Sequence, residues 1–175
     1  MIIGSLSENL NLEKRISLTP DLLKKYSNIG FQVMLEKNYG NHLGFKDSEY
    51  EKEGCEISDR TNVINKSDII LQLNLPDDTV LKNLKQNQIL IGTFNAHENT
   101  GKLKDLCEKK INIFSLELLP RITRAQSMDI LSSQANLAGY KAVIESFSTF
   151  EKAIPMMMTA AGTISAAKVL VVGAG

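Results

Sequence analysis

The segment Thr19-Pro-Asp-Leu-Leu-Lys-Lys-Tyr-Ser-Asn-Ile-Gly-Phe-Gln-Val-Met-Leu35 combines the start and end signals of a helix with an apolar strand directly behind it. Thr19 can cap the helix, and Pro20 suits its first position because the first residues of a helix need no amide donor. Gly30 tolerates the left-handed conformation in which many helices end. We therefore predict a helix over residues 21–28 and a strand over residues 31–35.

Short runs rich in Ile, Val and Leu recur on both sides of this unit, with helical patterns between them. They cover residues 2–3, 31–35, 68–73, 88–94 and 111–118. A second helix, over residues 102–109, can begin at Asn99 or Thr100, and Lys109 and Lys110 at its end suit the helix dipole. Buried strands that alternate with helices are typical of parallel sheets. The sequence therefore predicts an α/β, Rossmann-like N-terminal domain with a parallel sheet.

The pattern changes after Pro120. Residues 125–150 carry apolar side chains at helical spacing and predict one long helix with a bend near Gly139. Residues 155–167 are mostly small, and residues 168–172 predict a buried strand. We expect an N-terminal domain over residues 1–124, a connecting helix and linker over residues 125–165, and the truncated start of a second Rossmann domain over residues 166–175.

Gly173, Ala174 and Gly175 follow that last strand. A strand that leads into Gly-x-Gly is how a dinucleotide-binding βαβ unit opens, although a plain turn after a strand is the alternative on spacing alone. One buried strand without neighbours is not stable, so we expect the chain to be a piece of a longer protein.

Composition is that of an ordinary globular protein: 175 residues, 43% hydrophobic, 23% charged, with a formal net charge of zero. This balance argues against nucleic-acid binding. Cys55 and Cys107 lie far apart in sequence and predict reduced, mostly buried thiols rather than a disulfide or a zinc site. The least charged stretch, residues 153–167, is shorter than the roughly 20 apolar residues that span a bilayer. We expect no signal peptide, no membrane-spanning segment and no metal site in this chain.

Two blocks carry a specific resemblance. The first is Arg121-Ile-Thr-Arg-Ala-Gln-Ser-Met-Asp-Ile-Leu-Ser-Ser-Gln-Ala-Asn-Leu-Ala-Gly-Tyr-Lys-Ala-Val143. The second is Pro155-Met-Met-Met-Thr-Ala-Ala-Gly-Thr163, followed by Lys168-Val-Leu-Val-Val-Gly-Ala-Gly175. Both resemble the NAD(H)-binding alpha subunits of proton-translocating NAD(P) transhydrogenases. The motif Glu13-Lys-Arg-Ile-Ser-Leu-Thr-Pro20 is similar to one shared more widely with alanine dehydrogenases.

The resemblance implies an enzyme component with two Rossmann-like domains that binds NAD(H) in the cleft between them. Its implied partners are an NADP(H)-binding transhydrogenase domain, a membrane-spanning domain that moves the proton, and a second copy in a homodimer. It implies a peripheral place on the cytoplasmic or matrix-like face of an energy-transducing membrane. Carried over by position, the catalytic residues are Arg121, Gln126 and Asp129. The same resemblance assigns cofactor binding to these three and to Ile122, Thr123, Ser127, Met128, Ser132, Gly173, Ala174 and Gly175.

The residue types suit this chemistry. Hydride transfer between two nicotinamide rings needs positioning rather than an acid–base histidine. Gln126 offers both a donor and an acceptor, Arg121 offers a planar fork, and Asp129 can orient Arg121. By residue type alone, Arg121, Arg124 and Asp129 would be solvated or ion-paired charges at the start of a helix. The resemblance favours the functional interpretation.

Alanine dehydrogenase is the main alternative, and a non-catalytic truncated module is the other. Amino-acid oxidation requires a lysine and a histidine near the substrate, together with the Arg of the shared motif. In our alignment Asn74 takes the place of the lysine and Ala96 that of the histidine, with His97 adjacent. We therefore expect no amino-acid chemistry and a structural role for Arg15. For His42 and His97 we predict surface or capping roles. We predict that the following side chains pack in the interior: Phe45, Tyr50, Met156, Met157 and Met158.

Overall fold

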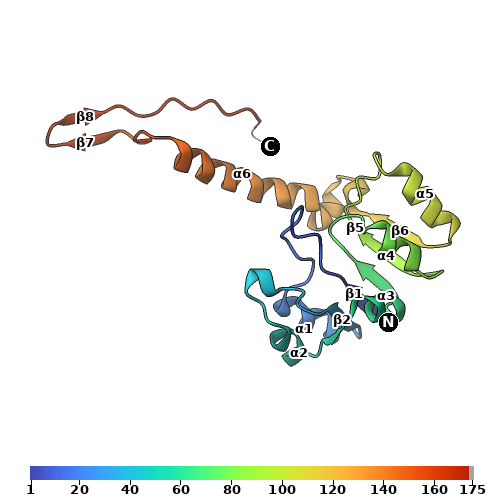
Figure 1. The fold of residues 1–175 in the computed structure, drawn as a ribbon. Coiled ribbons are helices and arrows are strands. Elements are labelled where there is room, and N and C mark those ends of the chain that lie inside the picture. The colour runs from blue at the N-terminus through green and yellow to red at the C-terminus, as the bar shows by residue number, and fades with distance from the viewer. Residues whose placement is uncertain (174–175) are drawn as a thin grey trace. The chain divides into compact units, whose positions relative to one another are not determined.

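The structure is a computed structural model that describes residues 1–173. It divides into two compact units, Met1–Asp129 and a second unit that begins at Ile130. Figure 1 labels the helices and strands of both units.

The first unit is built on a six-stranded, fully parallel sheet with the strand order β3-β2-β1-β4-β5-β6. Its strands are β1 (Ile2–Ser5), β2 (Gln32–Glu36), β3 (Glu56–Ser58), β4 (Ile69–Leu71), β5 (Ile89–Gly92) and β6 (Asn112–Ser115). The Rossmann-like fold and all five predicted strands of this domain are confirmed. The short edge strand β3 was not predicted from the sequence.

Helices cover both faces of this sheet. They are α1 (Pro20–Asn28), α2 (Asp47–Lys52), α3 (Arg60–Lys66), α4 (Asp78–Asn83) and α5 (Thr100–Glu108), with the 3-10 turns η1 (Asn41–Leu43), η2 (Leu116–Leu118) and η3 (Thr123–Met128). Along β2, Val33 and Leu35 belong to one core cluster and Met34 to the other, because successive side chains of a strand point to opposite faces. Leu23 of α1 and Tyr50 of α2 pack into the first cluster. The second contains Val63, Ile64, Val80, Leu81 and Leu106 from α3, α4 and α5.

Local signals explain how α1 ends. Gly30 has a φ of 86°, and its amide donates to Ser27 while the Phe31 amide donates to Tyr26. These two bonds form a Schellman motif, which satisfies carbonyls left over at the helix end. The predicted stop at Gly30 is confirmed. At the other end Thr19 holds the N-cap position, but its side chain makes no capping hydrogen bond.

The two cysteines differ. Cys55 is buried, and burial raises the pKa of its thiol to about 12. Cys107 is exposed on α5, so the prediction of a mostly buried thiol was wrong there. The adjacent Leu106 is the buried residue of this helix, and the next position along a helix is turned away by about 100°. Tyr50 is fully buried and Phe45 packs edge-on against it, as predicted.

The second unit contains α6 (Ile130–Thr149), β7 (Met157–Thr159) and β8 (Gly162–Ile164). The helix predicted from residue 125 begins only at Ile130, because Asp129 has a ψ of 88° and interrupts the helical dihedral angles after the 3-10 turn η3. α6 then runs through Gly139 without a break in its assignment. No helix in residues 1–173 is long and apolar enough to cross a membrane.

The segment after α6 also differs from expectation. β7 and β8 form an antiparallel hairpin that was not predicted, and Met156, Met157 and Met158 are exposed rather than core filler. Residues 168–172 form no strand within the described chain and are largely exposed. A strand is defined by the neighbour that satisfies its backbone groups, and no described segment pairs with these residues. The second Rossmann domain therefore stays a prediction.

Candidate functional site

The segment of residues 121–129 folds as a series of tight turns between β6 and α6. The Ile122 amide donates to Pro120, the Ala125 amide to Ile122, and the Asp129 amide to Gln126. Ala125 is the buried residue of η3 and anchors it, whereas the polar side chains on either side of Ala125 are exposed. The turns thus present polar groups on a short, locally hydrogen-bonded frame.

An ion pair joins the two ends of this segment. Arg121 Nε lies 3.3 Å from Asp129 Oδ2 and donates to it. The Asp129 side chain is 13% exposed and that of Arg121 is 67% exposed. The carboxylate is therefore mostly covered and binds Nε of an arginine whose side chain is largely exposed, an arrangement in which Asp129 can orient Arg121.

These residues line an open cleft of about 410 Å³ together with Gln126. The lining residues are Arg121, Ile122, Thr123, Gln126 and Asp129. The helix predicted from residue 125 would place Gln126 and Asp129, three residues apart, on one face. They do line the same cleft, but through a 3-10 turn, in which residues three apart are stacked along the axis.

The remaining predicted site residues lie elsewhere. Ser127 and Met128 are exposed on η3 and are not among the residues that line the cleft. Ser132 lies in the first turn of α6, in the second unit. Gly173 has a φ of 92°, which suits glycine in a turn, and Ala174 and Gly175 lie outside the described residues.

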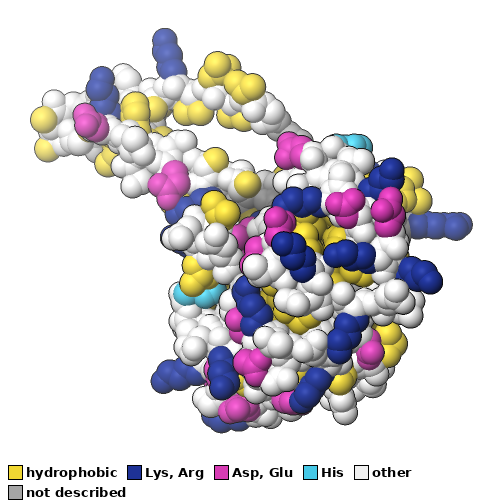
Figure 2. Space-filling view, turned by 45° about the vertical axis from the view of Figure 1, so that its right-hand side comes forward, with side chains coloured by type: hydrophobic (Ala, Val, Ile, Leu, Met, Phe, Trp, Pro, Cys, Tyr) yellow, Lys and Arg dark blue, Asp and Glu magenta, His cyan; other side chains and the backbone are white. Residues whose placement is uncertain are grey.

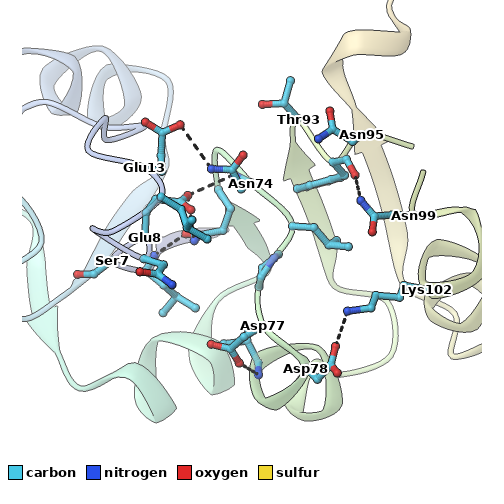
Figure 3. Close-up of a pocket in the computed structure, with 18 of the residues that line it drawn as sticks. Ser7, Glu8, Glu13, Asn74, Asp77, Asp78, Thr93, Asn95, Asn99 and Lys102 are labelled. Carbon is cyan, nitrogen blue, oxygen red and sulfur yellow. Dashed lines mark hydrogen bonds and ion pairs between the residues drawn. The ribbon is translucent and has the colours of Figure 1, made fainter. Parts of the chain in front are cut away.

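A larger cavity, of about 820 Å³, lies at the carboxyl ends of β1, β4 and β5. β1 and β4 are the adjacent strands at which the strand order reverses, and open α/β sheets bind ligands at such a point. Figure 3 draws this cavity with Ser7, Glu8 and Glu13 on one side and Thr93, Asn95 and Asn99 on the other. Our sequence reasoning missed it. The sequence does carry a polar residue within two positions of the end of each strand, Ser7, Gln72 and Thr93, but it does not say which strands are neighbours in the sheet.

Glu8 ties two walls of this cavity together. Its Oε1 accepts hydrogen bonds from the amide of Leu73 at 2.7 Å, from Gln72 Nε2 at 3.2 Å and from the amide of Asn74 at 3.4 Å. Burial raises the pKa of this carboxyl, and the amide hydrogen bonds oppose that effect only in part.

The carboxylate of Glu13, which also lines the cavity, accepts hydrogen bonds from Arg15 and Asn74. Arg15 donates to it through Nε at 2.9 Å and through a terminal nitrogen at 2.6 Å, a two-pronged pair of the strong kind. Asn74 Nδ2 lies 3.4 Å from the carboxylate, so that three residues compared with alanine dehydrogenases in sequence lie together. The Arg15 guanidinium is the main reason that the pKa of Glu13 is lowered to about 2.

The rim carries further ion pairs. Lys102 pairs with Asp78 at 2.8 Å, and Arg60 bridges Asp77 and Glu36. On the face shown in Figure 2, Lys and Arg side chains are interspersed with Asp and Glu side chains. This face therefore has no continuous positive area of the kind that tracks a phosphate backbone. Within residues 1–173, no group of three or more His, Cys, Asp or Glu side chains is placed to hold a metal ion.

Comparison with known proteins assigns the family. The description "Alanine dehydrogenase/PNT, N-terminal domain" belongs to the family model that matches residues 4–138. The chain belongs to this family. It is 42% identical over 180 residues to an NAD(P) transhydrogenase subunit alpha polypeptide of Rickettsia prowazekii (strain Madrid E), an alignment that covers 100% of this chain and 47% of that relative.

Within the alanine dehydrogenase/PNT family, the chain is more similar to these transhydrogenases than to an alanine dehydrogenase. The crystal structure of transhydrogenase from Sinorhizobium meliloti superposes with a TM-score of 0.89 at 36% identity, covering 95% of this chain and 50% of that one. Alanine dehydrogenase 1 of Staphylococcus aureus (strain Mu50 / ATCC 700699) is 25% identical over 144 residues, 82% of this chain and 38% of the relative. The resemblance inferred from the motifs is confirmed. The chain spans about half the length of these two transhydrogenase relatives.

The two positions that align with the lysine and the histidine of alanine dehydrogenases are Asn74 and Ala96, and they lie in different surroundings. Asn74 lines the cavity at the end of β4, and Ala96 lies in the loop after β5, where its amide donates to Glu117. His97 is exposed, and so is His42, whose Nε2 lies 2.7 Å from the Lys14 carbonyl. Neither histidine lines the cavity.

Proposed function

We propose that this chain is the N-terminal portion of the NAD(H)-binding component of a proton-translocating NAD(P) transhydrogenase. The observation that carries the proposal is the cleft made by Arg121, Gln126 and Asp129, in a chain so similar to transhydrogenase alpha subunits over its whole length. In this proposal residues 121–129 bind the nicotinamide end of NAD(H). Ser127, Met128 and Ser132 extend the contact, and Gly173, Ala174 and Gly175 begin the pyrophosphate turn of the second domain.

The cleft residues fit the group they would hold. A nicotinamide carboxamide or a ribose presents both donors and acceptors, and the Gln126 amide can match either. The Gln126 side chain makes no hydrogen bond with any of residues 1–173, so its donor and acceptor remain available. Arg121 lines the cleft, and its pair with Asp129 can set its orientation.

The bound nicotinamide would supply the hydride, and the protein supplies its position and electrostatic environment. Because hydride passes directly to a second nicotinamide, no substrate hydroxyl or amine has to lose a proton at this site. The residues of the cleft accordingly include no histidine, cysteine or lysine. Positioning by a short, internally hydrogen-bonded frame is what such a reaction requires.

The proposal extends to partners and location. An NADP(H)-binding domain presents the second nicotinamide, a membrane-spanning domain couples hydride transfer to proton movement, and two copies of the subunit form a homodimer. The component then lies on the cytoplasmic or matrix-like face of an energy-transducing membrane.

An alanine dehydrogenase-like activity is the second candidate, favoured by the cavity at β1, β4 and β5 and by Arg15 beside it. Two observations oppose it. Asn74 has no ammonium to polarise a keto acid, and the Arg15 side chain binds Glu13, so a substrate carboxylate would have to compete with that pair. A third candidate is a non-catalytic module.

The test uses the full-length protein with its NADP(H)-binding partner. Hydride transfer between NADH and an oxidised NADP analogue should proceed, whereas NAD-dependent oxidation of L-alanine should not. Turnover of alanine would favour the dehydrogenase, and loss of both activities despite NADH binding would favour the non-catalytic module.

A further inference from the structure

Glu117 lies on η2, between the edge strand β6 and Pro120, and both of its carboxylate oxygens accept hydrogen bonds. Oε1 accepts from Ser115 Oγ at 2.6 Å and from the Ala96 amide at 2.9 Å. Oε2 accepts from the Phe94 amide at 3.2 Å. Burial acts to raise the pKa of this carboxyl, but the hydrogen bonds from Ser115, Ala96 and Phe94 leave it below its ordinary value. Glu117 is therefore ionised at neutral pH.

These contacts continue the pairing of two strands after their ladder ends. β5 and β6 pair as far as Gly92 and Ser115, and beyond that point the two chains diverge. The amides of Phe94 and Ala96 then have no strand carbonyl opposite them, and the Glu117 carboxylate binds both instead. The ring of Phe94 is buried in the core, so the β5 side of this contact is fixed.

On the other side, Glu117 fixes the point from which residues 121–129 depart. The Leu119 amide donates to Leu116 within η2, Pro120 has a fixed φ, and the Ile122 amide donates back to Pro120. The Ala125 amide then donates to Ile122. Each bond spans few residues, so a displacement of η2 would pass along the frame to Arg121 and Gln126.

We propose that Glu117 is a positioning residue for hydride transfer, which sets the place of Arg121 and Gln126 by locking η2 to the loop after β5. This inference rests on the proposed function of residues 121–129. Glu117 itself lines neither the cleft nor the cavity, so its effect passes through the segment that it anchors.

The test is a double-mutant cycle in the full-length protein with its NADP(H)-binding partner. Glu117→Gln keeps the size of the side chain but replaces one accepting oxygen with a donor. Single-turnover hydride transfer should fall on the order of 10-fold, because small misplacements of reacting groups cost that much, while the Kd for NADH changes by less than about 3-fold. Glu98→Gln, the same change in an exposed residue of the same loop, should leave the rate within about 2-fold.

The cycle adds Gln126→Asn. If Glu117 acts through the placement of Gln126, the double variant should transfer hydride about as fast as the slower single variant, because effects that share one cause do not add. If the two rate losses multiplied in the double variant, the positioning role of Glu117 would be overturned. A normal rate in Glu117→Gln beside a slow rate in Gln126→Asn would overturn it as well. A normal rate in Gln126→Asn would instead remove Gln126 from the proposed nicotinamide site. These two failures are thus distinguishable.

A milder variant covers the case in which Glu117→Gln does not fold. Ser115→Ala removes one donor to the carboxylate, together with an acceptor that lies 3.4 Å from the Phe94 amide, and leaves both backbone contacts to Glu117. The transfer rate should therefore fall about 2- to 3-fold, with faster hydrogen exchange at the Ala125 amide. An unchanged rate together with unchanged exchange at Ala125 would count against the proposal.

Discussion

The two concave sites of the first unit differ in what their polar groups bind. At the cavity beside β1, β4 and β5, Glu8 and Glu13 each accept several hydrogen bonds from neighbouring residues. At the cleft of residues 121–129, Arg121 and Asp129 orient each other, whereas the Gln126 side chain is exposed without a protein partner among residues 1–173. The polar groups of the larger site are therefore hydrogen-bonded within the protein, whereas the smaller site presents the Gln126 amide on a locally hydrogen-bonded frame.

Cavity size alone is therefore a poor guide to function in this protein. The hydrogen bonds of Glu8 and Glu13 around the larger cavity hold the loop of residues 7–19 in place. This loop carries the motif shared with alanine dehydrogenases. Removing its contacts should lower stability more than hydride transfer. Changes at residues 121–129 should do the reverse.

The largest effect on stability is expected at Tyr39, which anchors that loop to the sheet. Its hydroxyl accepts from the Ser17 amide at 3.0 Å and from the Leu18 amide at 3.3 Å, and it also bonds Ser5 Oγ. Tyr39→Phe would leave buried donors without an acceptor and should lower the free energy of unfolding by about 2 kcal/mol. Denaturant unfolding measures this, with Tyr140→Phe at an exposed position of α6 as the control. Equal stability of the two variants would contradict a structural role for the loop contacts.

A smaller effect is expected from the Glu13–Arg15 pair. Because the folded pKa of Glu13 is lowered to about 2, its contribution is present above its unfolded pKa of about 4.5 and is lost as the pH falls from there through about 2. Arg15 is half exposed, so solvent screening leaves only about 1 kcal/mol of the gain that the shift implies.

Unfolding free energies between pH 2 and pH 6 test this, with Glu13→Gln as the comparison. The wild-type protein should lose stability relative to the variant as the pH falls through this window. Parallel pH profiles would mean that the pair contributes nothing, and that Arg15 is available to a ligand after all.

The smallest effect is expected at the rim of the cavity. Lys102 and Asp78 lie 2.8 Å apart, but their side chains are 53% and 65% exposed. Exposed pairs of this kind contribute little, so a double-mutant cycle with Lys102→Ala and Asp78→Ala should show no measurable coupling. A clear coupling would show that the rim is shielded from solvent and would weaken the contrast between the two sites.

Local sequence signals predicted most of the fold. Thr19, Pro20 and Gly30 marked a helix because capping depends on neighbouring residues, and the apolar runs marked the buried strands. β3 was missed because it is short, lies at the sheet edge and has no buried residue. The start of α6 was misplaced because a single dihedral angle at Asp129 decides it, and composition does not report that angle.

The candidate site could likewise be predicted from the sequence only in part. The Arg121–Asp129 pair could be predicted because both residues belong to one short segment. The cavity could not, because its walls come from loops after β1, β4 and β5 that meet only through the order of strands in the sheet. The role of Glu117 likewise depends on the register in which β5 and β6 end together.

The most direct test of the account is the response of the full-length protein and its NADP(H)-binding partner to Gln126→Asn, which shortens the side chain by one methylene. Single-turnover hydride transfer between NADH and an NADP analogue should fall by a factor on the order of 10 to 100, because the reacting ring would be misplaced. The Kd for NADH should stay nearly constant, and the free energy of unfolding should change by no more than about 0.5 kcal/mol, as for other exposed polar substitutions. An unchanged transfer rate would remove Gln126 from the site, and equal losses in rate and affinity would make it a binding residue only.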